Sequence, residues 1–269
     1  MNYKKAWSFI KKDFIIESSY KLNFIQSLFT SIFPIVSFFF IGKMVAGNHL
    51  AELEKYGGRY FPFVLIGIAF VRFFQLAVDT FSTNIKRAQM AGCLEAILSA
   101  QTDPKAIVVM SSLYSFLSAG LQLVLMFLIA VIFLGYDFST ANVPATMLTL
   151  TASLIIFISL GIFSAAGTVI FKQGEPIGWI FGVASALLGG AMFPVAVMPG
   201  WLQQLSLFFP LTYALDALRL ALLKGNSIIM LSQQLFILGG MAVFAFPLSL
   251  KTFEWAIEKG KKDGTLMQY

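Results

Sequence analysis

Two pairs of opposite charges lie in apolar surroundings and are the first candidates for chemistry in this sequence. Arg72 and Asp79 are seven residues apart within a long apolar stretch, a spacing that places both on one face of a helix. Asp216 and Arg219 are three residues apart, close enough to pair along a helix. Because intramembrane charge is costly, Arg72 and Asp79 form either a structural pair or snorkelling charges, or else they contact a substrate or gate.

Enzymatic chemistry has few residues available to it. The sequence holds one histidine, His49, and one cysteine, Cys93. An intramolecular disulfide and a thiolate metal cluster are therefore excluded, and so are most nucleophile–base and metal constellations. It contains no G-x-x-x-x-G-K-[ST] phosphate loop and no H-E-x-x-H or G-x-S-x-G motif. We therefore expect no catalytic residue, no metal site and no cofactor, and any energy taken from ATP must come through another chain.

The composition indicates that the solvent of this chain is lipid. Of 269 residues, 58% are hydrophobic and only 12% are charged, whereas ordinary soluble domains carry about a quarter charged residues. The formal net charge of +6 comes from basic residues between the apolar blocks. Such residues orient helices in a bilayer, so we expect no binding to nucleic acid.

Six apolar blocks have about the length of 20 residues that crosses a hydrocarbon core. These predicted spans are residues 22–45, 60–81, 105–134, 143–171, 176–192 and 227–250. Lys and Arg are concentrated in the segments on the same side as the N-terminus, which predicts that both termini are cytoplasmic. The expectation is an all-α membrane protein, with residues 1–269 as one domain in the plasma (inner) membrane.

Two terminal segments are predicted to lie outside the spans. Residues 3–20 place Trp7 and Phe14 on one face of a helix and lysines on the other, which is typical of a helix in the membrane interface. Packing of this helix on a partner protein is the alternative. Residues 251–269 are rich in charge and are predicted to form a cytoplasmic tail.

The polar stretch between the second and third spans contains a predicted short helix, residues 86–100. Leu94 and Leu98 contribute to its apolar face, and Lys86, Arg87 and Glu95 keep the rest in water. A helix of this length is marginal on its own because nucleation is costly. It is expected either to dock on a partner or to remain a solvated connector.

Residues 193–219 are too apolar for an exposed loop, but Pro194, Pro199 and Pro210 prevent one continuous helix. Broken backbone at membrane depth is tolerated only where protein or a water-filled cavity covers it. We therefore predict a helical hairpin that re-enters the outer leaflet, with Trp201 and Tyr213 at the interface. The alternative is a purely architectural cap.

These segments together resemble the permeases of the type-2 ABC exporter family, which serve polysaccharide, glycolipid and drug export. The predicted short helix 86–100 is similar to the family's coupling helix through Gly92, Leu94, Glu95 and Leu98, although Gln101 stands where many relatives have proline. Residues 3–20 look like the family's interfacial helix. The most specific resemblance is in the last third of the chain, at Phe193, Pro194, Pro199, Trp201, Leu202, Pro210, Leu211, Thr212, Tyr213, Asp216 and Arg219.

The resemblance implies a homodimer or heterodimer of six-span subunits, bound to two cytosolic ATPase subunits that hold ATP and magnesium. The substrate path would lie between the two permeases, and the outer hairpin would help to close it. The alternatives are a secondary transporter or channel not driven by ATP, and a membrane enzyme acting on lipids. The first usually shows internal repeats and the second an acid–base set, and the sequence shows neither.

Overall fold

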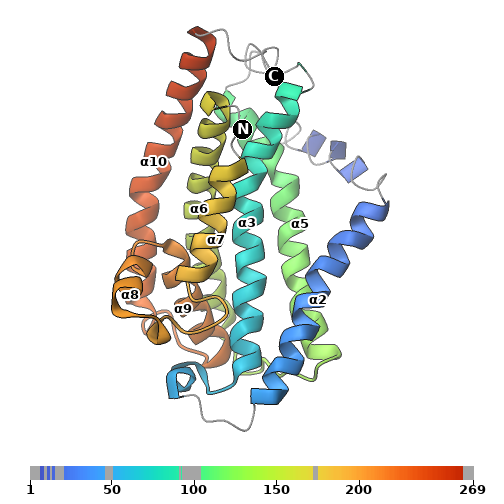
Figure 1. Cartoon of the computed structure of the whole chain (residues 1–269), viewed down its shortest axis with the longest axis vertical. Helices are drawn as coiled ribbons and strands as arrows, with labels where there is room; N and C mark the ends of the chain where they lie inside the picture. The colour runs from blue at the N-terminus through green and yellow to red at the C-terminus, as the bar shows by residue number, and fades with distance from the viewer. Residues whose placement is uncertain are drawn as a thin grey trace.

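The fold is described by a computed structural model covering residues 7–8, 11–12, 14–15, 21–45, 51–90, 92, 104–171 and 175–262. In this part of the chain every regular element is a helix (Figure 1). The bundle contains α2 (Lys21–Val45), α3 (Tyr60–Met90), α5 (Pro104–Ile132), α6 (Val143–Phe171), α7 (Glu175–Leu188) and α10 (Ser232–Lys262). The shorter elements are η1 (Ala51–Tyr56), η2 (Val195–Val197), α8 (Gly200–Ser206) and α9 (Pro210–Leu223).

Four helices in the described residues, α3, α5, α6 and α10, are long and apolar enough to cross a membrane. The count rises to five if the bent pair of α8 and α9 is taken as one broken span. The predicted all-helical membrane fold is confirmed at this level. The count of six spans stays a prediction, since α7 has 14 residues and is about 21 Å long, shorter than a hydrocarbon core of roughly 30 Å.

The structure agrees with some predicted boundaries and corrects others. The predicted span 143–171 coincides with α6, but α3 continues through Met90 and α10 continues to Lys262. Hydropathy falls where the lysines and arginines begin, but these residues are good helix formers, so the helices continue into the polar region. Part of the predicted tail 251–269 is therefore the last turns of α10.

The core of the bundle is the contact of α3 with α6. Phe74 of α3 and Phe157 of α6 are fully buried, and their rings meet edge to face at 4.7 Å. Small residues let the two backbones approach closely. A Cβ added at Gly161 would lie 2.5 Å from the ring of Phe81 and 2.7 Å from the carbonyl oxygen of Ala77. Gly161 therefore sets the distance between α3 and α6.

Most buried hydroxyl groups of α6 bond to the helix that carries them, and that of Ser164 has no partner in the described part of the chain. Thr149 donates to the carbonyl of Ala145 at 2.8 Å, and Ser153 donates to that of Thr149 at 2.7 Å. Such bonds to the preceding turn leave these hydroxyl donors paired without a partner helix. In lipid, where water cannot replace a missing partner, this pairing permits polar residues inside the bundle.

Large apolar side chains cover the outside of the bundle. Phe33 of α2 is 73% exposed, and Leu121 of α5 and Phe244 of α10 are exposed as well. In water, apolar patches of this extent mark a contact site or an aggregation hazard. In a bilayer the same side chains face a solvent as apolar as themselves, as expected for a membrane protein.

The two ends of the bundle differ in their elements. Figure 1 shows η1, α8 and α9 together at one end, and the last turns of α3 and α10 at the other. Arg87 lies in the last turn of α3, and Lys259, Lys261 and Lys262 lie in the last turn of α10. One end of the bundle therefore collects basic residues on helix termini, and the other carries the proline-broken segment.

Replacing Gly161 with alanine should force α3 and α6 apart. We expect the free energy of unfolding to fall by about 1–3 kcal/mol, the usual cost of overpacking. Thermal unfolding in detergent micelles, followed by circular dichroism, measures the change. Gly239→Ala on α10 is the matched control, because a Cβ there meets no atom within 4 Å, and it should not lower stability. Equal losses in the two variants would contradict the close contact at Gly161.

Candidate functional site

The segment from Phe193 to Arg219 folds as short helices that each follow or begin with proline. Pro194 caps η2, Pro199 caps α8, and Pro210 occupies the first turn of α9. Proline suits these positions because its φ is already helical and the missing N–H would lack a partner there. The axes of α8 and α9 meet at 89°, so the segment turns sideways instead of crossing the bundle.

Side chains satisfy the backbone where the helices are broken. Gln203 donates to the carbonyls of Ala196 and Met198 at 3.1 and 2.8 Å, and Thr212 donates to that of Ser206 at 2.8 Å. These bonds meet the requirement that irregular backbone near a bilayer be paired within the protein.

The two aromatic residues predicted for the interface differ in their surroundings. Tyr213 donates its hydroxyl to the carbonyl of Leu207 at 3.0 Å. The ring of Trp201 is 64% exposed on α8. An exposed indole at the end of a helical bundle is typical of a residue in the membrane interface, whereas Tyr213 ties α9 to the turn before it.

Arg219 is the buried cation of the site. Only 2% of it is exposed. Its Nη1 donates to the carbonyl of Gly190 at 3.0 Å, its Nη2 to that of Ala191 at 2.8 Å, and its Nε to that of Phe63 at 3.2 Å. The guanidinium also lies 3.5 Å from the centre of the Phe63 ring, within the range of a cation–π contact. Arg219 thereby joins α9 to α3 and to the chain after α7.

Two of the three carbonyls that accept from Arg219, those of Gly190 and Ala191, lie just after the end of α7. Gly190 adopts a φ of +68°, a left-handed conformation that glycine adopts readily and that commonly ends a helix. The carbonyls of Gly190 and Ala191 follow the last residue of α7 and lie near the negative end of its dipole, so a buried cation is stabilised beside them. A Cβ at Gly67 of α3 would lie 1.9 Å from the carbonyl oxygen of Ala191, so only glycine admits this approach.

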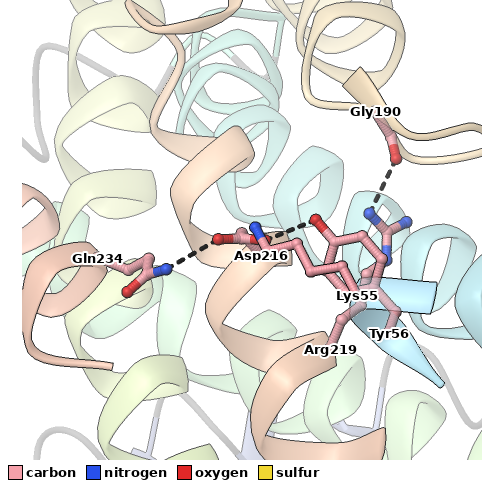
Figure 2. A network of polar contacts seen from close by, with 6 residues as sticks. All are labelled: Lys55, Tyr56, Gly190, Asp216, Arg219 and Gln234. Atoms are coloured by element: carbon pink, nitrogen blue, oxygen red, sulfur yellow. Dashed lines mark hydrogen bonds and ion pairs between the residues drawn. The ribbon is translucent and has the colours of Figure 1, made fainter. Parts of the chain in front are cut away.

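Asp216 is the centre of a second set of contacts, shown in Figure 2. It accepts a hydrogen bond from Lys55 at 2.6 Å, from the Tyr56 hydroxyl at 2.6 Å and from Gln234 at 2.8 Å. Its side chain is 18% exposed and that of Lys55 is 55% exposed. One carboxylate on α9 therefore holds both η1 and the start of α10.

Tyr56 links the two charged residues of α9. Burial, the negative charge of Asp216 and the hydrogen bond to it all raise the pKa of Tyr56 above its usual value. The phenol therefore stays protonated and remains a donor throughout the physiological range. Its ring lies 5.8 Å from the guanidinium of Arg219, so the two charges contact opposite parts of one side chain.

The predicted ion pair between Asp216 and Arg219 is wrong. Both residues lie on α9, but the ion-pair partner of Asp216 is Lys55, and Arg219 bonds to carbonyls. The three-residue spacing permits a pair, but neighbouring elements offer each side chain more hydrogen bonds than the other charge could. The sequence reasoning missed Lys55, Tyr56, Gln234 and Gly67; a lone glycine in an apolar helix was the only local signal, and only for Gly67.

The residues predicted to couple to an ATPase lie at the end of α3 and beyond it. Lys86 and Arg87 belong to α3 instead of opening a separate helix, because α3 ends only at Met90. Gly92 follows with a φ of +65° and bonds back to the carbonyl of Gln89 at 2.9 Å, as in a helix terminus. The predicted helix 86–100 therefore begins too early. Leu94, Glu95 and Leu98 lie outside the described residues.

Arg72 and Asp79 do not form a structural pair, which was one of the alternatives for these two charges. Arg72 is partly exposed and donates through Nη2 to the Thr30 hydroxyl of α2 at 3.2 Å. Asp79 is exposed two turns further along α3. The two residues share a face, as their spacing predicts, but the hydrogen bond of Arg72 reaches across to another helix.

An apolar cavity of about 330 Å³ lies between α3, α5, α6 and α9. Phe70, Phe127, Leu150 and Leu222 are among its lining residues. Its one hydroxyl-bearing residue, Thr146, already donates to the carbonyl of Asn142. The cavity therefore suits an apolar group and is chemically distinct from the contacts of Asp216 and Arg219.

The fold and the site together define a multi-pass helical membrane protein. Apolar helices face lipid, a broken segment is held by polar contacts, and no group of three or more His, Cys, Asp or Glu residues in the described ranges could hold a metal ion. The sequence model of the family described as ABC-2 type transporter matches residues 6–223. The chain therefore belongs to the ABC-2 type transporter family, and the resemblance to type-2 ABC permeases is confirmed. No curated protein matches the chain in a sequence comparison.

Exchanging the charges of Asp216 and Arg219 should not restore stability. Arg219→Leu leaves carbonyls after α7 without donors, at about 1–3 kcal/mol for each buried group. The double variant Asp216→Arg, Arg219→Asp should unfold more readily still, because a carboxylate would then face those carbonyls. Unfolding midpoints in detergent measure both changes.

Lys55→Met is the control for loss of an exposed charge and should cost less than about 1 kcal/mol. A double exchange that recovers the wild-type midpoint would show that Asp216 and Arg219 pair with each other after all.

Proposed function

We propose that the chain is the permease subunit of an ABC exporter, in which a second permease copy completes the substrate path. Separate cytosolic ATPase subunits bind ATP and magnesium and drive transport, and the permease itself carries no catalytic residue. The observation that carries this proposal is the family match over residues 6–223. The arrangement of the helices supports it.

The proposed topology has six spans with both termini in the cytoplasm of a plasma (inner) membrane. The spans are α2, α3, α5, α6, α7 and α10, and α8 with α9 forms the re-entrant segment. Basic residues at the ends of α3 and α10 support the orientation, because positive charge is retained on the cytoplasmic side. Helical, exposed residues such as Trp7 and the contact of the Phe14 and Tyr114 rings at 6.4 Å support an interfacial N-terminal helix.

In this topology the proline-broken segment faces outward and acts as the outer gate. Its helices are tied to α3 and the end of α7 by Arg219, and to α10 and η1 by Asp216. Movement of any of these helices must therefore move α9 or break a buried bond. That connection allows a change at the cytoplasmic end of a span to open or close the outer end.

The cytoplasmic coupling region comprises the end of α3 and the residues that follow it. Lys86, Arg87 and Gly92 are continuous with α3, and Leu94, Glu95 and Leu98 supply the proposed contact with the ATPase. Because α3 runs without interruption from Tyr60 to Met90, a force at its cytoplasmic end reaches the Phe63 carbonyl beside Arg219. This continuity makes α3 the proposed lever between ATP hydrolysis and the gate.

Substitution of the coupling leucines should separate ATP hydrolysis from transport. Leu94→Asp and Leu98→Asp place a charge in the proposed apolar contact, and we expect the permease to insert normally but to lose its ATPase partner. Co-purification of a phosphate-loop ATPase expressed with the permease measures binding, and substrate-stimulated ATP hydrolysis measures coupling. Leu266→Asp, the same change elsewhere in the chain, is the control. Normal coupling in both leucine variants would exclude docking at this stretch.

Cysteine labelling tests the orientation of the bundle. On a Cys93→Ser background, Lys261→Cys should react with a membrane-impermeant maleimide only after the membrane is opened. Glu52→Cys, which lies on the exposed surface of η1, should react from outside in intact cells. The reverse pattern would invert the topology and with it the outer placement of the gate.

A further inference from the structure

Arg72 is a charged side chain far inside the bilayer, and part of its hydrogen-bonding capacity is unused. It lies about 18 Å along α3 from Tyr60, more than half way through a hydrocarbon core of roughly 30 Å. In the described part of the chain its one hydrogen bond is to Thr30, and its Nε is buried without a partner. A cation at this depth is costly and usually marks a pathway or a binding site.

The surroundings of Arg72 differ from those of Arg219. Arg219 bonds through Nε and both terminal nitrogens to carbonyls inside the protein. Arg72 bonds only to the hydroxyl of Thr30 among the described residues. The nearest acidic residue on its own helix face, Asp79, lies about 10 Å further along α3. An Arg219-like anchoring function is therefore a poor explanation of Arg72. Because Arg72 is partly exposed, an external anion can approach its guanidinium.

Polar side chains continue from Arg72 to the cytoplasmic end of α3. They recur at intervals of three or four residues, are partly or fully exposed, and interrupt a helix that is otherwise mostly buried and apolar. The residues of this polar stripe are Arg72, Gln75, Asp79, Thr83 and Lys86. A stripe of this kind gives a polar group a path from the proposed cytoplasmic side to the middle of the membrane.

Two other helices flank the polar stripe. Figure 1 shows α2 and α7 on opposite sides of α3, and both helices pack against it. The side chain of Gln75 reaches to 3.5 Å from the Cβ position of Gly182 in α7. On α2, Phe33 is exposed on the same helix face as Thr30, and Phe29 is exposed one turn before Phe33. A cation is therefore flanked by exposed aromatic surface.

A cation beside exposed aromatic side chains favours a particular kind of ligand. A guanidinium binds phosphate or carboxylate oxygens with two parallel hydrogen bonds, which a neutral sugar or a cationic drug cannot reproduce. The phenylalanines of α2 offer apolar area for a hydrocarbon chain. Resting on the exporter function proposed above, we propose that the substrate is an amphiphile with an anionic headgroup, that Arg72 binds this headgroup, and that Thr30 positions Arg72.

A matched pair of amphiphiles tests the proposal on the purified full-length permease. Oleoyl lysophosphatidic acid and monooleoylglycerol share one acyl chain, and only the first carries a phosphate. Isothermal titration in a neutral detergent measures both affinities. Wild-type protein should bind the phosphate-bearing amphiphile at least about tenfold more tightly, as expected for a charge-assisted contact.

Substitutions assign the preference to Arg72. Arg72→Gln should bring the two affinities to within about twofold, and Arg72→Lys should keep part of the preference, since it retains the charge without the planar fork. Arg59→Gln, which removes an exposed arginine just before α3, is the matched control and should leave the ratio unchanged. Affinity for monooleoylglycerol reports that each variant is folded.

Two outcomes would overturn the proposal. The first is equal affinity of the wild-type protein for both amphiphiles. The second is an unchanged ratio of the two affinities in Arg72→Gln, which would follow if Arg72 instead pairs with an acidic residue of a second copy. The assay needs no ATPase. If the permease binds an ATPase but does not prefer the phosphate-bearing amphiphile, only this inference is refuted. If it prefers that amphiphile but binds no ATPase, only the exporter function is refuted.

Discussion

The structure depends on one buried guanidinium that has no carboxylate partner. Arg219 bonds to carbonyls of α3 and of the chain after α7, and it carries the end of α9 with it. A carboxylate in its place would have brought a second charge into the interior, and removing two charges from water often costs more than their attraction returns. Carbonyls at a helix terminus supply negative potential without a full charge, so the site stays stable at the edge of a lipid phase.

A ring of polar contacts surrounds that centre and explains why the broken segment can be apolar elsewhere. Asp216 holds η1 and α10, Tyr56 lies between Asp216 and Arg219, and Gln203 pairs the carbonyls around η2. With its irregular backbone satisfied in this way, the segment can expose Trp201 and its neighbours to lipid or interface. The polar groups of this segment are paired, in contrast to Arg72, whose buried Nε has no partner in the described part of the chain.

Sequence patterns predicted the features that depend on neighbouring residues, such as helix length and helix breaks. The length of α6 follows from its uninterrupted apolar run, and the breaks at Pro194, Pro199 and Pro210 follow from the missing N–H of proline. The end of α3 was missed because hydropathy marks where a membrane ends, whereas helix propensity decides where a helix ends.

Contacts between distant segments could not be read in the same way. Lys55 and Asp216 are separated by 161 positions, and nothing in the spacing around either residue points to the other. Asp216 and Arg219 were the only oppositely charged residues close together in the sequence of α9, but in the fold each bonds to groups from other segments. Gly67 shows the same limit, since the need for glycine there arises from the carbonyl of Ala191, which lies after the end of α7.

The position of Arg219 also constrains how this protein can be made. If α9 entered the bilayer alone, Arg219 would have no partner, and an unpaired charge inside a membrane costs up to a few kcal/mol. The carbonyls that receive Arg219 come from Phe63, Gly190 and Ala191, all earlier in the chain. During synthesis the receiving groups of α3 and α7 are thus already present when α9 emerges. The order of elements along the chain matches the order of assembly that a buried arginine requires, so α9 can leave the aqueous phase after α3 and α7 and lock those helices in place.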